Sequence, residues 1–246
     1  MSTGIKRPYA MMAGIANTMA EKLAPYCKRI VVAGSIRRQK AEIGDIELVV
    51  IADGDKLTER LNQIMADGKI RHVEAGPKKT KRWGDKQKSF LFDAADGQPV
   101  QVDVFICQPE TWGYTLLVRT GSGGFSNRIV TPIDRRTHEG LPGLMPMKYK
   151  CVESRVVTTD GTVLDTPEED DIFHLWNIEP VAPHLRTDDC KPTPRKSTGR
   201  PLKDGYRRIQ GETSDVYWDV RIWKDGEMDM PPMELLAKLR QERATA

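Results

Sequence analysis

Apolar residues recur every three or four positions in two long segments of the chain, and this spacing predicts amphipathic helices. Met11, Ile15 and Met19 form the clearest stripe. Further helix starts are indicated by Pro109 and by Thr166-Pro167, because proline suits the first turn and threonine caps it. The predicted helices cover Ala10–Leu23, Asp55–Ala66, Pro109–Leu117, Phe125–Arg136 and Thr166–Trp176, with a last one after Pro231-Pro232.

Short β-branched and aromatic runs between these segments predict strands. Asp160-Gly161 is a strong hairpin signal between two of them. The predicted strands cover Ile30–Ala33, Ile46–Ile51, Ile70–Ala75, Ser89–Phe92, Val100–Ile106, Lys150–Thr158, Thr162–Leu164 and Val216–Ile222. The chain therefore mixes strands and helices along its length, which is typical of an α/β (α+β) fold.

Carboxylates interrupt two of the predicted strands. Asp45 and Glu47 are two residues apart, so their side chains project to the same face of one strand. Asp103 lies between Val102 and Val104, where a carboxylate needs a partner or a metal. Each acid taken singly is explained by pairing with an arginine on a solvated sheet face. The three together favour a magnesium site, because magnesium takes carboxylate ligands with substrate phosphates.

A glycine–serine pair precedes these acids in the chain. Gly34-Ser35 follows a predicted strand, and glycine lets the backbone approach a phosphate closely. A helix that starts there would present free N–H groups. Arg37 and Arg38 could then neutralise phosphate charge. The spacing between this pair and the two acids makes the combination specific.

These motifs resemble the nucleotidyltransferase superfamily and, more closely, the family X DNA polymerases. The pattern of a strand, Gly-Ser, about ten residues and an acid-hydrophobic-acid triplet extends here from Gly34 to Glu47. Val102–Val104 matches the strand of the third acid, and Val118–Ser122 matches the turn before the nucleotide-contacting helix. Thr166–Phe173, with Pro180–Arg186, resembles the closing segment. The resemblance covers residues 10–186 and is closest to minimal viral and phage versions.

The resemblance implies an architecture. Residues 1–120 would form a nucleotidyltransferase palm with a mixed β-sheet. Residues 121–186 would form a small α/β nucleotide-binding subdomain of the thumb type. Residues 187–246 would be a basic linker and a small tail, whose role the sequence does not indicate.

The resemblance also implies roles for individual residues. Asp45 and Glu47 would hold two magnesium ions, with manganese as a substitute, and Asp103 would help to hold the catalytic ion. The residues implied in nucleotide binding are Gly34, Ser35, Arg38, Gly44, Thr120, Gly121, Ser122 and Asn127. Two positions depart from the family pattern: Glu47 replaces the usual aspartate, and Val118-Arg119 replaces an aromatic pair.

Positive charge is concentrated locally although the formal net charge is only +3. Gly76–Lys88 contains six basic residues and one acidic residue, and Asp188–Arg208 contains seven basic and three acidic residues. Such runs are either solvated loops or phosphate contacts. Trp83 would either stack on a base or pack on the sheet. The candidate DNA-binding residues are Lys78, Lys79, Lys81, Arg82 and Arg200.

Composition excludes several other classes of protein. Charged residues make up 30% and hydrophobic residues 39%, which argues against full disorder. Apolar runs fall well short of the roughly 20 residues of a membrane helix. The four cysteines are far apart and show no zinc spacing, which is typical of reduced thiols in a cytoplasmic protein. We therefore expect a cytoplasmic monomer, in the host-cell cytoplasm if the source is viral.

The leading hypothesis is a Mg²⁺-dependent DNA polymerase that fills gaps or repairs primer–template DNA from nucleoside triphosphates. A second reading is a template-independent nucleotidyltransferase acting on RNA, a protein or a small molecule. A third is a non-catalytic DNA-binding module, against which the three intact acids argue.

Overall fold

The computed structural model describes residues 5–75, 80–195, 206–210 and 217–221. It divides into two compact units, Met1–Thr193 and Pro194–Ala246. In the second unit, the described residues form one antiparallel hairpin of β13 (Tyr206–Gln210) and β14 (Tyr217–Arg221). The strand predicted from Val216 is therefore confirmed, but its partner β13 begins inside the stretch that was predicted as a linker.

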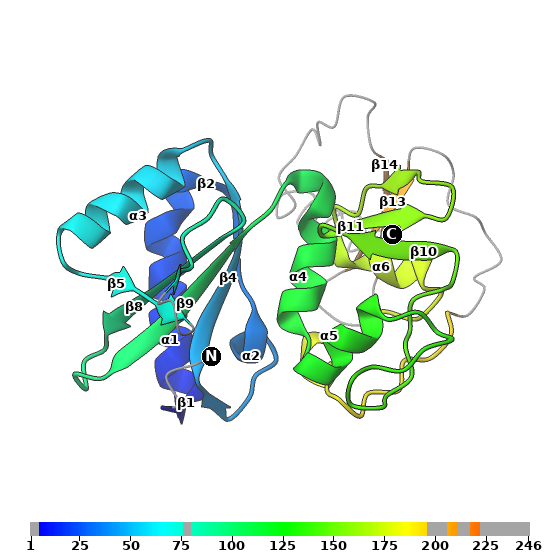
Figure 1. The fold of residues 1–246 in the computed structure, drawn as a ribbon, viewed down its shortest axis with the longest axis horizontal. Helices are drawn as coiled ribbons and strands as arrows, with labels where there is room; N and C mark the ends of the chain where they lie inside the picture. The colour runs from blue at the N-terminus through cyan, green and yellow to red at the C-terminus, as the bar shows by residue number, and fades with distance from the viewer. Residues whose placement is uncertain (1–4, 76–79, 196–205, 211–216, 222–246) are drawn as a thin grey trace, which may run out of the picture. The chain divides into compact units, whose positions relative to one another are not determined.

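The first unit contains a mixed five-stranded sheet, which lies on the left in Figure 1 and confirms the predicted fold class. Only the pair β4–β9 is parallel among its described strand pairs. The order across the sheet is β2 (Cys27–Val32), β4 (Asp45–Ala52), β9 (Pro99–Ile106), β8 (Gln87–Asp93) and β5 (Arg71–His72).

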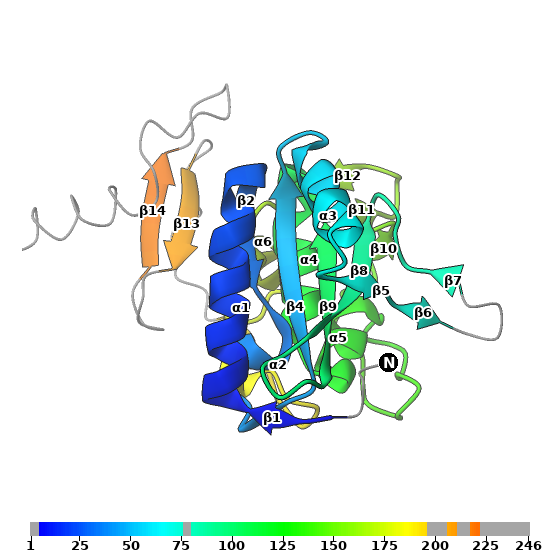
Figure 2. The ribbon, with the colours of Figure 1, turned by 90° about the vertical axis from the view of Figure 1, so that its left-hand side faces the viewer.

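Helices α1 (Tyr9–Leu23) and α3 (Lys56–Ala66) cover one face of this sheet (Figure 2). Their buried side chains, such as Met12 and Leu61, pack with the inward residues of β4 and β9 in one hydrophobic core. Both helices follow the predicted apolar stripes. This burial fixes the strand parity, because Ile46 and Leu48 face the core and Asp45 and Glu47 must then face the opposite side.

Helix α4 (Trp112–Thr120) packs against the acid-bearing face of the sheet. A one-turn 3₁₀ helix (Pro109–Thr111) precedes it, so the helix predicted from Pro109 is present and extends three residues further than expected. Trp112 and Leu116 bury themselves against Val49 and Phe105 in a separate hydrophobic cluster. This packing covers one end of the acid-bearing face and leaves the acids beyond it.

The rest of the first unit surrounds a further core that includes Phe125, Phe173 and Trp176. Its elements are α5 (Gly123–Val130), α6 (Glu169–Leu175) and a three-stranded antiparallel meander of β10 (Tyr149–Val152), β11 (Arg155–Thr158) and β12 (Val163–Leu164). The short remaining elements are α2 (Gly34–Arg37), the pair β1 (Arg7–Pro8) and β3 (Glu42–Ile43), the pair β6 (Glu74–Ala75) and β7 (Thr80–Lys81), and 3₁₀ turns at Ala24–Tyr26 and Pro183–Leu185.

Two predicted elements differ from the structure, each for a local reason. The helix predicted to reach Arg136 ends at Val130, because Thr131 is extended and Pro132 follows. The strand predicted over Lys150–Thr158 is two strands, because Glu153 and Ser154 have φ values of 50° and 66° and make a tight turn.

Two further predictions are corrected by long-range contacts. The predicted strand Ile70–Ala75 is split between β5 and β6, which pair with different neighbours. Helix α6 begins after a capping box of Glu168 and Asp171, not at Thr166, whose backbone instead bonds to Glu110 and Gly113. Across the described part of the chain, no helix is both long and apolar enough to cross a membrane.

Candidate active site

The parallel register of β4 and β9 brings the predicted acids together. Glu47 is the direct partner of Asp103, and Asp45 is the partner of Gln101. Side chains two residues apart on a strand point to the same face of the sheet. All three carboxylates therefore lie on the face that α4 covers further along, opposite the core under α1 and α3.

Asp103 is held by three amide or hydroxyl donors. Its side chain is buried and accepts hydrogen bonds from the Ser89 hydroxyl, from Gln87 Nε2 at 3.3 Å and from Gln101 Nε2 at 2.8 Å. Ser89 is the cross-strand partner of Asp103 on β8. These neutral donors fix the direction of the carboxylate without neutralising its charge.

Asp45 and Glu47 are in a different electrostatic state. Neither carboxylate forms an ion pair or a side-chain hydrogen bond with another residue in the described part of the chain. Burial, reinforced by the charge of Asp45, raises the pKa of Glu47 to about 7. Burial, reinforced by Asp103, likewise raises the pKa of Asp45. The charges of Arg119 and Arg38 oppose this rise in the pKa of Glu47 only in part, and a bound cation would oppose it further.

The donor chemistry of this cluster suits a hard divalent cation, which prefers carboxylate oxygens. The arrangement itself is more open than a finished coordination shell. Among the described residues, no group of three or more His, Cys, Asp or Glu side chains is placed to hold a metal ion. The observation that supports a cation is therefore the unneutralised charge of Asp45 and Glu47, and not a preformed cage.

Gly34 lies against the carboxylate of Glu47. Its φ is +62°, and a Cβ atom at this position would lie 2.0 Å from Glu47 Oε2. The backbone N–H of Ala33 also donates to the Glu47 carbonyl at 2.8 Å. A glycine is therefore required here both by its conformation and by the reach of the glutamate. Ser35 follows on the four-residue helix α2, and Gly44 immediately precedes β4.

Arg38, a predicted phosphate contact, is directed at backbone carbonyls. Its Nη1 donates to the Thr120 carbonyl at 2.5 Å and to the Gly121 carbonyl at 2.8 Å. Burial lowers the pKa of Arg38, although the charge of Glu47 opposes the effect. Its Nε is buried without a partner among the described groups. The arginine thus joins the end of α2 to the turn after α4 and keeps one unused donor.

The predicted Thr-Gly-Ser turn connects α4 to α5. Gly121 ends α4, and Ser122 caps α5 by accepting a hydrogen bond from Phe125 N at 3.3 Å. A Cβ atom on Gly121 would lie 2.5 Å from Ser126 Oγ, so the turn requires glycine there. Asn127 is exposed and donates to Glu139 at 3.2 Å, away from the tight contacts of this turn.

Asp188 is a contact that the sequence prediction missed. It begins the predicted linker, but its Oδ1 accepts from Gly124 N at 2.9 Å at the start of α5. Hydrogen bonding to the Ser122 hydroxyl lowers the pKa of Asp188. A carboxylate at the N-terminus of a helix is also favoured by the helix dipole, which explains the position of Asp188 at the start of α5. Two Asp residues in a basic run were the available sequence signal.

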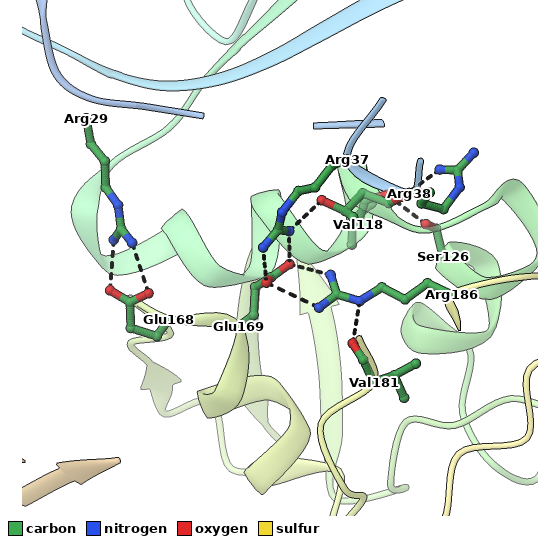
Figure 3. A network of polar contacts seen from close by, with 10 residues as sticks. Arg29, Arg37, Arg38, Val118, Ser126, Glu168, Glu169, Val181 and Arg186 are labelled. Carbon is green, nitrogen blue, oxygen red and sulfur yellow. Dashed lines mark hydrogen bonds and ion pairs between the residues drawn. The ribbon is translucent and has the colours of Figure 1, made fainter. Parts of the chain in front are cut away.

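A buried ion network, also missed by the sequence prediction, joins Arg37 of α2 to Glu169 and Arg186 (Figure 3). Glu169 accepts bidentate bonds from Arg37 at 2.7 and 2.8 Å and also bonds to Arg186 Nη1 and Nη2. Arg37 reaches Thr120 Oγ1 at 2.8 Å as well. Burial would raise the pKa of Glu169, but the charges of Arg186 and Arg37 lower it to about 2.

A second ion pair joins Arg29 to Glu168, with Arg29 Nη1 2.8 Å from Glu168 Oε1 (Figure 3). The guanidinium of Arg29 also lies 4.3 Å from the Trp112 ring. Because β2, α4 and the residue before α6 all take part, this pair and the Glu169 network join the sheet to the part of the unit that follows α4.

The candidate DNA-binding residues are only partly described. Lys81 and Arg82 are exposed at and after β7, whereas Lys78, Lys79 and Arg200 lie outside the described residues. Trp83 packs on the sheet. The centroids of its ring and the Phe90 ring are 6.5 Å apart, and its Nε1 donates to Asn62 Oδ1 at 3.1 Å. The same basic run therefore contains both a core contact and exposed cations.

A cleft of about 750 Å³ is lined by residues of β8, β9, α4 and the β10–β11 turn, and Asp45, Glu47 and Asp103 are not among its described lining residues. Its walls include Gln87, which bonds to Asp103, and Arg119, whose guanidinium lies 3.9 Å from the Phe105 ring. The opposite wall is the β10–β11 turn with Arg155. Gln87 connects this cleft to Asp103, and the volume is large enough for a nucleotide-sized group.

No protein-family model matches the sequence, and no curated protein matches it either. The geometry of the site is therefore the basis for the functional argument.

Proposed function

We propose that the protein is a divalent-metal-dependent nucleotidyltransferase that adds nucleotides to the 3′-hydroxyl of a DNA primer and releases pyrophosphate. The observation that carries this proposal is the cluster of Asp45, Glu47 and Asp103, which combines adjacent strands, unneutralised charge and a glycine turn at its edge. Carboxylates in this state attract divalent cations that also bind phosphates.

The chain's own residues have distinct tasks in this proposal. Asp45 and Glu47 would hold the cations, and Asp103, whose carboxylate is fixed by Gln101 and Ser89, would take the proton of the attacking hydroxyl. Bound cations supply Lewis acidity to the attacking and leaving oxygens.

Triphosphate binding would use the Gly34-Ser35 turn and Arg38. Gly34 is buried with the Glu47 carboxylate against it, which fixes this turn beside the acids. Arg38 has one buried N–H without a described partner and lies near the negative cluster. A small rotation of its guanidinium would exchange its bonds to two carbonyls for bonds to phosphate, which are stronger because the acceptor is charged.

Primer extension on gapped, recessed and single-stranded DNA, with deoxy- and ribonucleotides and Mg²⁺ or Mn²⁺, tests the proposal. We expect template-directed extension on gapped DNA, and loss of extension in Asp103→Asn with folding intact. Asp134→Asn, an exposed acid away from the cluster, is the matched control and should retain full activity. Full activity of Asp103→Asn would contradict the assignment, and extension indifferent to template would favour a template-independent transferase.

A further inference from the structure

A groove of about 820 Å³ lies on the face of the sheet opposite the acids, between α1 and α3. Figure 2 shows both helices on this same face of the sheet. The floor of the groove includes Phe90 and Leu61 of the main core. Met11, Ile15 and Met19 of α1 line one side and are only partly buried. An apolar hollow of this size on a protein surface is typical of an interaction site.

The lining residues of α1 recur at helical spacing along the groove. They extend from Met11 to Lys22, so the groove follows the helix for about 17 Å, or three turns. A second helix fits such a surface through residues at i, i+3, i+4 and i+7. The methionines among them suit an interface that adapts to its partner.

Gly14, in the middle of α1, supports the same interpretation. Glycine inside a helix costs about 1 kcal/mol relative to alanine, and a Cβ atom here would meet nothing within 4 Å. Neither backbone conformation nor crowding within the described residues explains the glycine. A bare position midway along the groove lets another helix approach the α1 backbone closely.

The charge of the groove defines the partner further. Three described lining residues are charged, and all are cationic: Lys22, Arg60 and Lys69. They come from α1, α3 and the segment after α3, so they border the groove on both sides. Lys69 Nζ forms an ion pair with Asp67 at 3.2 Å, so Lys22 and Arg60 are the main cations of the groove. Complementary charge on a partner would steer its binding.

From these features we infer that the groove between α1 and α3 binds an acidic amphipathic helix of a partner protein. A small-molecule pocket would have polar groups converging on its floor. Here the floor is apolar, and Thr18 is the one uncharged side chain with a polar group among the described lining residues. The inference is independent of the proposed nucleotide transfer, because the groove and the acids lie on opposite faces of the sheet.

Selection from a displayed peptide library tests the inference on the full-length chain. The library presents 18-residue helices with fixed Leu anchors at i, i+3, i+7 and i+11 and with Glu, Lys or Ser at the remaining positions. We expect selected helices to be enriched in Glu over Lys. Fluorescence anisotropy with the enriched peptides should then show binding that weakens about tenfold when their Glu residues are replaced by Lys.

Variants locate the binding. Gly14→Phe fills the groove from a position with free space, and Lys22→Glu with Arg60→Glu reverses its charge. Each should weaken binding at least about tenfold without lowering the temperature of thermal unfolding, and primer extension should be unchanged. Lys150→Glu, on an exposed strand of the other core, is the matched charge control and should bind normally.

Several results would overturn the inference. These are no enrichment, enrichment of Lys over Glu, or equal binding to wild type and Gly14→Phe. Binding of the anionic amphiphile dodecanoate that Gly14→Phe abolishes, with no peptide bound, would assign the groove to a small molecule and also overturn it. Absence of primer extension by the wild-type protein would overturn only the proposed function, so the two proposals fail separately.

Discussion

Two glutamates that contact residues of α2 are in opposite electrostatic states. Glu47 lies beside Asp45 and Asp103, and burial with repulsion raises its pKa to about 7. Glu169 lies between Arg37 and Arg186, and their charges lower its pKa to about 2 despite burial. Both side chains are partly buried. The difference is the neighbour, since a buried carboxylate is stable as an anion only where cationic or donor groups surround it.

This comparison separates acids that stabilise the fold from acids that are available for chemistry. The Glu169 network has its counter-charges built in, so it has no need of a ligand. At Glu47 the charges of Arg119 and Arg38 act on the carboxylate without an ion pair to it among the described residues, and its pKa remains raised. Perturbed groups of this kind collect at functional sites. The following experiments change one region and read the effect against the other.

The largest expected effect is on activity, from Glu47→Gln. This nearly isosteric change removes one charge from the cluster, and we expect primer extension to fall by about 10²–10³-fold. The temperature of unfolding should stay the same or rise, because repulsion and desolvation are relieved. Glu59→Gln, an exposed acid on α3, is the control. Activity within threefold of wild type would show that Glu47 does not take part in catalysis.

Glu169→Gln should instead reduce stability. It leaves Arg37 and Arg186 close together without their carboxylate, and we expect the free energy of unfolding to fall by about 3 kcal/mol. Urea denaturation measures this change. A variant with all three residues replaced by Met or Leu should recover most of the loss, because removing the whole network also removes its desolvation cost. An unchanged urea midpoint in Glu169→Gln would contradict the prediction.

The two glutamates should also give opposite pH dependences in the metal-free protein. The lowered pKa of Glu169 contributes about 3 kcal/mol at neutral pH, which is lost as pH falls from about 4.5 through 2. The raised pKa of Glu47 has the reverse sign, so its contribution is lost as pH rises from about 4.5 through 7.

Unfolding by urea in EDTA at several pH values, for wild type and each Gln variant, measures both contributions. The stability gap between wild type and Glu169→Gln should shrink in acid. The gap between wild type and Glu47→Gln should change in the region of pH 4.5 to 7. Two curves of the same slope would remove the contrast between the sites.

Gly34→Ala tests how closely α2 approaches the acid cluster. Its positive φ and the nearby Glu47 carboxylate predict a loss of about 1–2 kcal/mol in the free energy of unfolding. Adding Glu47→Asp shortens the acid and should recover part of that loss, so the double variant is less than additive. Gly14→Ala is the control and should not destabilise, because its Cβ meets no atom. Full additivity would mean that the two residues do not interact.

The smallest effect is expected for Arg29→Gln. Its pair with Glu168 is about one-third exposed on each side, at 39% and 34%, so solvent weakens the attraction. Loss of the pair and of the contact with Trp112 should reduce the free energy of unfolding by about 0.5–1 kcal/mol. A loss as large as that of Glu169→Gln would show that the whole interface behaves as one network.

Much of the local structure follows from the sequence. The apolar stripes of α1 and α3 and the β-branched runs of β4 and β9 predict these elements correctly, because helix and strand periods are fixed by backbone geometry. Boundaries are less predictable. The turn at Glu153 and Ser154 contains no glycine, so the sequence does not indicate that both residues have positive φ values. Thr166 resembles a helix cap, but its backbone forms hydrogen bonds with Glu110 and Gly113.

The sequence predicts one part of the candidate site, and the fold determines the rest. The sequence places Asp45 and Glu47 on one face, since residues two apart on a strand always share a face. It does not indicate that Glu47 is paired with Asp103, which depends on the register of strands more than fifty residues apart. Nor does it separate Trp83, which packs on the sheet, from exposed residues in the same basic run.

The sequence by itself determined which segments form helices and strands and which acids share a face, because those properties depend on neighbouring residues. Only the tertiary structure decided which charges are neutralised. Arg37 and Glu169 are 132 residues apart, and no local pattern connects them. Their pairing, and the lack of such a pairing for Glu47 among the described residues, arise from the packing of distant segments, where burial makes each charge depend on its nearest neighbours.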